Sequence, residues 1–149
     1  MTKEEKVALI RERAKVSDSN DGGSLLGYLD IQYNELIDMF GKPNRDTDGY
    51  KIDAEWGIKF DNVSFSIYNY KDGINYNGEV DGLPVEMITE WHVGGRDKEK
   101  AAEFIKLITE NRTGPYKIEV DVEDIIEKIK GLDSSDLIHL KSFIERVYS

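Results

Sequence analysis

The strongest constraint on the fold is a stretch of strictly alternating residues in the middle of the chain. Apolar side chains occupy every second position over residues 52–60 and again over residues 63–67. Alternation with a period of two is the pattern of a β-strand with one buried face. Asp61 and Asn62 lie between the two runs, and both residue types tolerate the positive φ of a two-residue hairpin turn. The predicted cross-strand pairs are Phe60 with Val63, Ile58 with Phe65, and Trp56 with Ile67.

Apolar spacing predicts a further strand and a short helix before this hairpin. Residues 27–31 have the composition of a strand, and residues 33–40 carry apolar side chains at i, i+3, i+4 and i+7. Gly41 supplies a left-handed cap at the end of that helix, and Pro43 follows where a helix cannot continue. After the hairpin, residues 71–87 are rich in glycine and asparagine and predict a loop.

A third antiparallel strand and a longer helix are predicted after this loop. Residues 88–93 alternate again, which directs Trp91 and Val93 into the core. The glycine pair at residues 94–95 breaks the strand, and Asp97 is a good N-cap for the helix that follows. The residues expected on the buried side of that helix are Ala101, Phe104, Ile105 and Ile108.

Three segments are predicted along the chain. Residues 1–24 comprise a charged helix up to Val16, either loosely docked or bound to a partner, and a polar, glycine-containing linker. Residues 25–110 form the core domain, and residues 111–149 form a C-terminal αα-hairpin whose two helices carry apolar stripes. The predicted fold class is therefore α+β, with a small antiparallel sheet of three to four strands packed against helices.

Composition excludes several classes of function. Thirty acidic against twenty basic residues give a net charge of −10, and the lysines and arginines do not cluster, so direct binding of nucleic acid is disfavoured. An acidic chain can instead present carboxylates to a basic groove, as mimics of DNA do, or be acidic for solubility alone. The absence of cysteine excludes disulfides and thiolate chemistry. No membrane span or secretory signal is recognisable, so we expect the cytoplasm of a host cell.

The hairpin register also predicts a polar surface on the side away from the core. It places Glu55 across from Tyr68 and Asp53 across from Tyr70, within contact distance as cross-strand pairs. The outer face of a one-sided sheet is normally polar, so this pattern by itself does not require a function. The residues predicted to share the surface are Asp53, Glu55, Tyr68, Tyr70, Glu90, His92 and Arg96.

Tyrosines and asparagines gather near the predicted loop. They are Tyr68, Tyr70 and Tyr76, with Asn69, Asn75 and Asn77. Rigid rings and amides of this kind suit an adaptable recognition surface. The rings could also stack on a nucleobase. Tyrosine is equally at home in an ordinary strand, so composition leaves these interpretations open.

A glycine pair before the predicted helix is a candidate anion site. The backbone N–H groups of Gly94 and Gly95, together with the guanidinium of Arg96, could bind a phosphate or a carboxylate. A tight turn would use the same residues, and Asp97 as the N-cap would compete with an anion for these donors.

Neither a metal site nor a catalytic centre is predicted. His92 among carboxylates is a poor zinc set, because His139 lies far away on the last predicted helix. Asp53 and Glu55 could serve as an acid and base pair, but no catalytic motif accompanies them. We therefore expect a protein without a cofactor and without enzymatic activity.

Two resemblances add context. The segments IYNYKDG (residues 67–73) and TEWHVGG (residues 89–95) resemble small phage and prophage proteins of no established activity, over roughly residues 25–108. More distantly, residues 40–43 followed by a tryptophan-bearing meander resemble the helix-then-sheet module of β-lactamase-inhibitory and outer-membrane-assembly lipoproteins, which are binding modules. This chain lacks their secretion signal and cysteine, so the resemblance implies neither their location nor their partners.

These features predict a non-catalytic binding protein of a phage or mobile element that blocks a host protein, such as a defence nuclease with a basic DNA groove. One alternative is a protein that sequesters a nucleotide or nucleotide-derived signal. Tyrosines would stack on its base, and Arg96 with the backbone amides of Gly94 and Gly95 would hold its phosphate. Another is an accessory protein that forms a homodimer through its amphipathic terminal helices.

Overall fold

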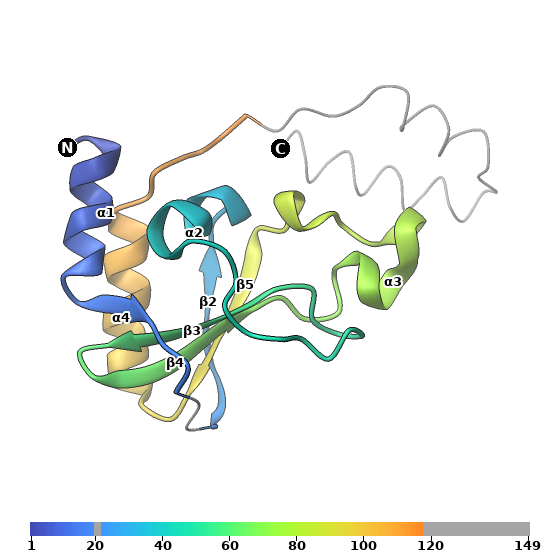
Figure 1. Ribbon diagram of the computed structural model, residues 1–149, viewed down its shortest axis with the longest axis horizontal. Helices are drawn as coiled ribbons and strands as arrows, with labels where there is room; N and C mark the ends of the chain where they lie inside the picture. The colour runs from blue at the N-terminus through green and yellow to red at the C-terminus, as the bar shows by residue number, and fades with distance from the viewer. Residues whose placement is uncertain (20–21, 118–149) are drawn as a thin grey trace.

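The computed structural model describes residues 1–19 and 22–117 (Figure 1). Its α-helices are α1 (Lys3–Arg11), α2 (Tyr33–Phe40), α3 (Ile74–Asp81) and α4 (Lys98–Glu110), and its 3-10 helix is η1 (Val85–Met87). Its strands are β1 (Ala14–Val16), β2 (Ser24–Asp30), β3 (Glu55–Phe60), β4 (Val63–Tyr68) and β5 (Glu90–Gly95). None of the helices in these ranges is long and apolar enough to cross a membrane. The two helices predicted for the C-terminal hairpin lie outside the described residues.

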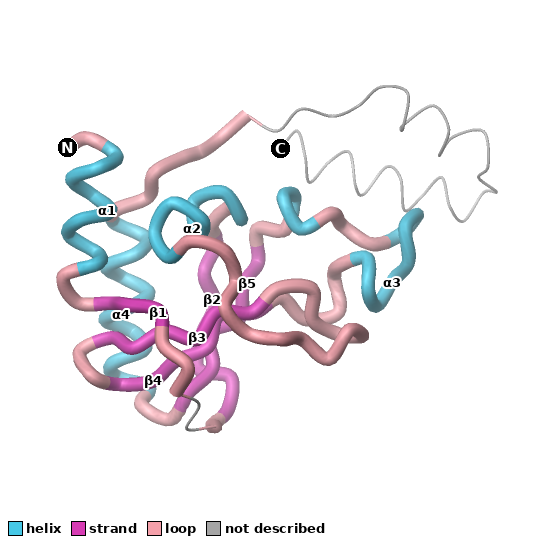
Figure 2. Tube along the Cα trace, viewed as in Figure 1, coloured by secondary structure: helices cyan, strands magenta, loops and turns pink. Residues whose placement is uncertain are grey.

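All five strands form one antiparallel sheet in the order β1-β3-β4-β5-β2 (Figure 2). The buried side chains of α1, α2 and α4 join those of the strands in a single core, so these three helices cover one face of the sheet. The predicted α+β class is confirmed. The sheet has five strands where three to four were expected, because residues 14–16 add β1 at one edge.

The hairpin of β3 and β4 has the predicted register. Phe60 pairs with Val63, and the pairing continues to Glu55 opposite Tyr68. Asp61 and Asn62 form the turn with φ of 47° and 65°, the positive values that a tight hairpin requires. β3 begins at Glu55, three residues after the start of the alternating pattern at residue 52. Residues 52–54 are therefore not part of the strand pair with β4.

The N-terminal segment differs from the prediction. The first helix ends at Arg11, and Ala14–Val16 forms β1 along β3. The side chains of Ile10 and Ala14 have no exposed surface, so the segment expected to dock loosely is part of the core. Pairing with β3 overrides the helix-favouring composition, since tertiary contacts outweigh local propensity.

Residues 71–87, predicted as a loop, contain α3 and η1. α3 is kinked at Gly78, where φ is 82°, and none of its side chains is buried. A segment without an apolar stripe gives no periodic signal of a helix. Its first turn is held from outside, because the backbone N–H of Asn75 donates to the Asp53 carboxylate at 3.2 Å.

Phe104 of α4 is the aromatic centre of the core. Its ring stacks on Phe65 of β4 with centroids 5.8 Å apart and an interplanar angle of 2°. Phe60 and Phe40 lie 5.3 and 6.3 Å from it. Asp97 caps this helix as predicted, accepting a hydrogen bond from the backbone N–H of Lys100 at 3.0 Å.

Truncation of Phe104 should therefore be costly. We expect Phe104→Ala to lower the free energy of unfolding by about 3–5 kcal/mol, because it removes contacts to β3, β4 and α2 and leaves a cavity. Lys106→Ala, at an exposed position of the same helix, should change it by less than about 0.5 kcal/mol. Urea denaturation of both variants measures the difference, and equal effects would contradict this account of the core.

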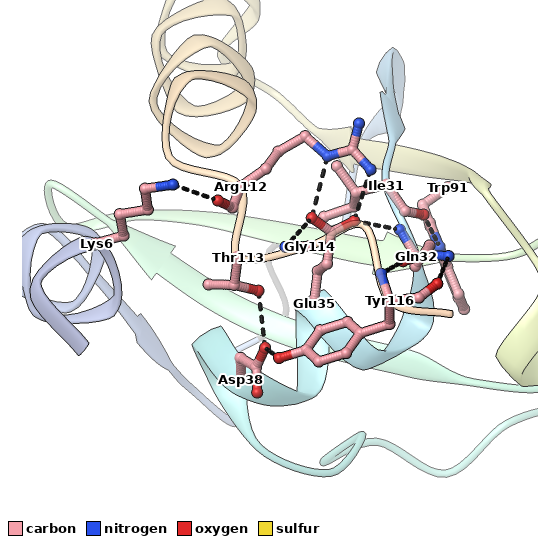
Figure 3. Close-up of polar contacts among 10 residues, drawn as sticks. All are labelled: Lys6, Ile31, Gln32, Glu35, Asp38, Trp91, Arg112, Thr113, Gly114 and Tyr116. Atoms are coloured by element: carbon pink, nitrogen blue, oxygen red, sulfur yellow. Dashed lines mark hydrogen bonds and ion pairs between the residues drawn. The ribbon is translucent and has the colours of Figure 1, made fainter. Parts of the chain in front are cut away.

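Residues 111–117 fold back onto α2 through a buried carboxylate (Figure 3). Glu35 has no exposed surface and accepts hydrogen bonds from Nε and Nη2 of Arg112, at 3.1 and 2.8 Å. The backbone N–H groups of Gln32 and Gly114 also donate to it, at 2.8 and 2.9 Å. Burial acts to raise the pKa of Glu35, but these donors outweigh it and hold the pKa below its ordinary value of 4.5.

The low pKa of Glu35 makes the fold acid-sensitive. A carboxyl whose pKa is lower in the folded chain stabilises the fold above its unfolded pKa, here 4.5, and loses that contribution as the pH falls through the folded value. We expect Glu35→Gln to lower the free energy of unfolding at neutral pH and to reduce its fall in acid. Urea denaturation across this pH range tests it, with Glu4→Gln, at an exposed position of α1, as the control. An unchanged acid dependence in Glu35→Gln would be inconsistent with this role.

Candidate functional site

The face of the sheet turned away from the core carries a run of aromatic side chains. Tyr28 on β2, His92 on β5 and Tyr68 on β4 are cross-strand neighbours. The ring centroid of His92 lies 5.0 Å from that of Tyr28, 5.3 Å from that of Tyr68 and 5.7 Å from that of Tyr70. The structure thus brings together three of the residues that the sequence placed on one surface, and adds Tyr28 to them.

Lys71 and two more tyrosines extend this run beyond the sheet. Lys71 Nζ lies 5.3 Å from the ring centroid of Tyr70 and 5.4 Å from that of Tyr76, which are cation–π distances. The rings of Tyr50 and Tyr76 lie 5.2 Å apart. We call the connected set the tyrosine band, and it comprises Tyr28, Tyr50, Tyr68, Tyr70, Tyr76 and His92.

The outer members of the tyrosine band are open to solvent. Tyr28 and Tyr50 are 51% and 55% exposed, and Tyr70 and Tyr76 are 40% and 38% exposed. These four are half of the eight large hydrophobic side chains that are exposed in the described residues. Because the other face of the sheet carries α1, α2 and α4, the band is not covered by them. Contiguous exposed apolar patches are typical of interaction sites, so the band is the candidate site of this protein.

Asn69 fixes the position of the band at the end of β4. Its side chain is fully buried, and its Oδ1 accepts hydrogen bonds from the backbone N–H groups of Asp53 and Ala54, at 2.8 and 3.0 Å. Its Nδ2 donates to the carboxylates of Asp53 and Asp72, at 2.9 and 3.1 Å. All four of its hydrogen-bonding positions are used, so the segments before β3 and after β4 are tied together.

The two carboxylates predicted for the site are engaged inside the fold. Asp53 binds Asn69 and the first turn of α3, and it lies before β3 rather than opposite Tyr70 in a strand pair. Glu55 lies opposite Tyr68 as predicted, and its carboxylate is 3.6 Å from Nη1 of Arg45. These contacts give both carboxylates a structural role.

The glycine pair predicted to bind an anion lies inside the sheet. β5 continues through Gly95, and both glycines are buried between β2 and β4, so the expected break in the strand is wrong. A Cβ at Gly94 would lie 3.2 Å from the ring of Tyr68, and one at Gly95 would lie 2.8 Å from the ring of Phe65. Arg96 follows the end of β5 and is exposed. Glycine at both positions therefore leaves room for the neighbouring aromatic rings.

Burial shifts the two central rings toward their neutral forms. It lowers the pKa of His92 below the ordinary value of 6.5, against the opposing effects of Glu90 and Asp72. Burial also raises the pKa of Tyr68 above 10.0, and the charge of Glu55 adds to this shift. At neutral pH the centre of the tyrosine band is therefore uncharged.

The groups of the tyrosine band and its neighbours are suited to non-covalent binding. Burial raises the pKa of Asp72 and of Glu55, although hydrogen bonds from Asn69 and the charge of Arg45 oppose these shifts. Within residues 1–19 and 22–117, no group of three or more His, Asp or Glu side chains could hold a metal ion. The band offers ring faces, hydroxyl groups and a neutral imidazole, which bind by stacking and hydrogen bonding.

Sequence reasoning missed Tyr28, Tyr50 and Lys71, and it placed Asn69 on the recognition surface although its side chain is buried. A signal for Tyr28 exists, because Leu29 beside it is buried and a strand paired with residues 90–95 places Tyr28 opposite His92. The others lie outside regular strands, so no periodic pattern locates them.

Comparison with models of protein families, with curated proteins and with solved structures finds no match to this chain. The geometry and charge of the tyrosine band are therefore the basis on which its function is inferred.

The environment of His92 can be checked by its titration. We expect an NMR pH titration to give His92 a pKa below 6.5, and Glu90→Gln to lower it further, because that carboxylate stabilises the imidazolium. Glu99→Gln, an exposed change on α4, should leave the value unchanged. A pKa above 6.5 would show that the ring is not desolvated as described.

Proposed function

We propose that this chain is a non-catalytic binding protein that engages a protein partner through the tyrosine band. The observation that carries the proposal is a continuous series of contacts that begins on the sheet and extends past the end of β4. Its members are Tyr28, His92, Tyr70, Lys71 and Tyr76. Tyrosine supplies a large contact area with little loss of side-chain entropy, and it is enriched among the residues that dominate protein interfaces.

The margin of the band supports a partner with basic side chains. Asp30 of β2 and Glu90 of β5 are directly opposite each other, and both are exposed. Like charges at opposite positions of a sheet repel each other, although the charge of Asp30 also interacts with that of Arg112. A lysine or arginine of a partner would relieve that repulsion and would be attracted by the net charge of −10.

A host protein is the partner that best fits these features. The resemblance of residues 67–73 and 89–95 to phage proteins supports a host target, and a nuclease with a basic DNA groove has the complementary charge. Occupation of such a groove would block the target without chemistry. The structural engagement of Asp53 and Glu55 supports a non-catalytic role, because neither carboxylate is available as an acid or base without loss of a fold contact.

The nucleotide alternative has less support. The rings of the tyrosine band could stack on a base. The predicted phosphate site, however, used the backbone N–H groups of Gly94 and Gly95, and both residues lie within the sheet.

Capture from host lysate by the immobilised chain tests the proposal. We expect a protein that is retained by the wild type and is released by high salt, because the acidic margin contributes through screened charges. Tyr70→Ala and Tyr76→Ala should each weaken its binding by about tenfold or more, as truncation of a tyrosine that dominates an interface does.

Val16→Ala is the matched control, because Val16 is 48% exposed on β1 and is not part of the tyrosine band. It should bind like the wild type. Retention that is insensitive to both tyrosine variants would refute the role of the band, and loss of capture after nuclease treatment would point to nucleic acid instead. A thermal shift with a nucleotide that Tyr70→Ala abolishes would favour the alternative.

A further inference from the structure

The outer edge of β2 has no strand partner among the described residues. β2 is the last strand in the sheet order, and within residues 1–19 and 22–117 β5 is its one pairing partner. It has seven residues, against three in β1 at the opposite edge. Leu25 and Tyr28 are 43% and 51% exposed along it, and Asp30 at its end is its one charged residue. Proteins usually protect such an edge with charges, proline or a covering segment.

A groove of about 450 Å³ runs beside this edge, between β2 and α4. Leu26 of β2 and Ala102 and Ile105 of α4 give it an apolar floor. α4 returns along β5 and therefore runs in the direction of β2 (Figure 1). The two elements touch where Ile105 lies over Gly27, since a Cβ there would be 2.7 Å from the Ile105 Cδ1 atom.

The wall of the groove carries opposite charges at its two ends. Lys98 lies at the N-terminal end of α4 and Glu110 at its C-terminal end, and both are exposed. The midpoint between these two positions is Phe104, next to Ile105. Gly27 is the midpoint of β2. A twofold axis that runs just outside the edge of β2, level with the contact of Ile105 with Gly27, would therefore pass close to the midpoints of both elements.

We propose that the edge pairs with the β2 strand of a second copy of this chain, in antiparallel orientation about that axis. The two five-stranded sheets then become one continuous sheet, as closed twofold assemblies allow. The α4 helices lie side by side in opposite directions, which places Lys98 opposite Glu110 of the second copy, and the reverse contact follows by symmetry. Apolar side chains at Leu26, Ala102 and Ile105 fill the space between them.

A charge exchange tests this arrangement on the full-length chain by analytical ultracentrifugation over a concentration series. We expect the wild type to form a dimer, and Lys98→Glu and Glu110→Lys each to weaken dimerisation by about tenfold, because two attractive contacts become repulsive. An equal mixture of the two variants should form a heterodimer with wild-type affinity, since every contact is again between opposite charges.

Both substitutions suit the helix dipole, which favours an acidic residue at a helix N-terminus and a basic residue at a C-terminus. Glu110→Lys also removes the ion pair of Glu110 with Lys106, 3.9 Å apart, but exposed pairs of this kind contribute little to stability. Lys59→Glu is the matched control, an exposed charge reversal on β3, and it should dimerise like the wild type. Hydrogen exchange should show the amides of residues 25–29 more protected in the wild type than in Lys98→Glu.

Two outcomes would overturn the proposal. One is a wild type that stays monomeric at every concentration. The proposal would fail in the same way if the β2 edge of that monomer paired with an extended peptide of another protein. The other is a dimer that both single variants leave intact, because its interface would lie elsewhere.

The dimer does not rest on the proposed function. Tyr70→Ala should leave the dimer intact, and Lys98→Glu should leave the tyrosine band of each copy intact. Failure of either idea can therefore be recognised separately. If both hold, the exposed rings of Tyr28 from the two copies lie near the same axis and the two bands form one surface.

Discussion

The turn at Asp61 and Asn62 is the constraint on which the arrangement of the sheet depends. It joins β3 to β4 without a spare residue, and a shift of one position would turn every core side chain of the hairpin toward solvent. The turn is also anchored from outside. Hydrogen bonds from Arg13 and Lys100 to the Asp61 carboxylate lower its pKa to about 2, so the segment after α1 and the first turn of α4 are both held at the hairpin tip.

The opposite end of the hairpin is organised by a single buried amide. Asn69 joins the segment before β3 to the segment after β4, and through Asp53 it also positions the start of α3. The neutral amide of Asn69 suits this position, because it donates to two carboxylates and accepts from two backbone N–H groups at once. The tyrosine band crosses this junction, and its outer half therefore depends on a polar network rather than on apolar packing.

An element of this fold could be predicted only where its burial leaves a periodic pattern in the sequence. Alternation fixed the hairpin register and the inward direction of Trp91 and Val93, because one buried face leaves a period of two in the sequence. α3 has no buried residue and hence no apolar period, and β1 is specified by its pairing with β3 rather than by its own composition. Tyr68 and His92 could be placed from register alone, whereas Tyr50 and Lys71 could not, since their positions depend on hydrogen bonds between distant segments.

The exposed rings of the tyrosine band can change with little effect on the fold. A change at Tyr28 or Tyr50 removes little buried surface, so it alters stability far less than a change at a core ring such as Phe104. Natural variants of the chain can therefore explore new side chains on this face while the scaffold persists. Tyr68 is an exception, because its ring lies against Gly94 and the two positions would have to change together. If the band binds a partner as proposed, changes in partner preference should begin at the rim of the surface and reach its centre last.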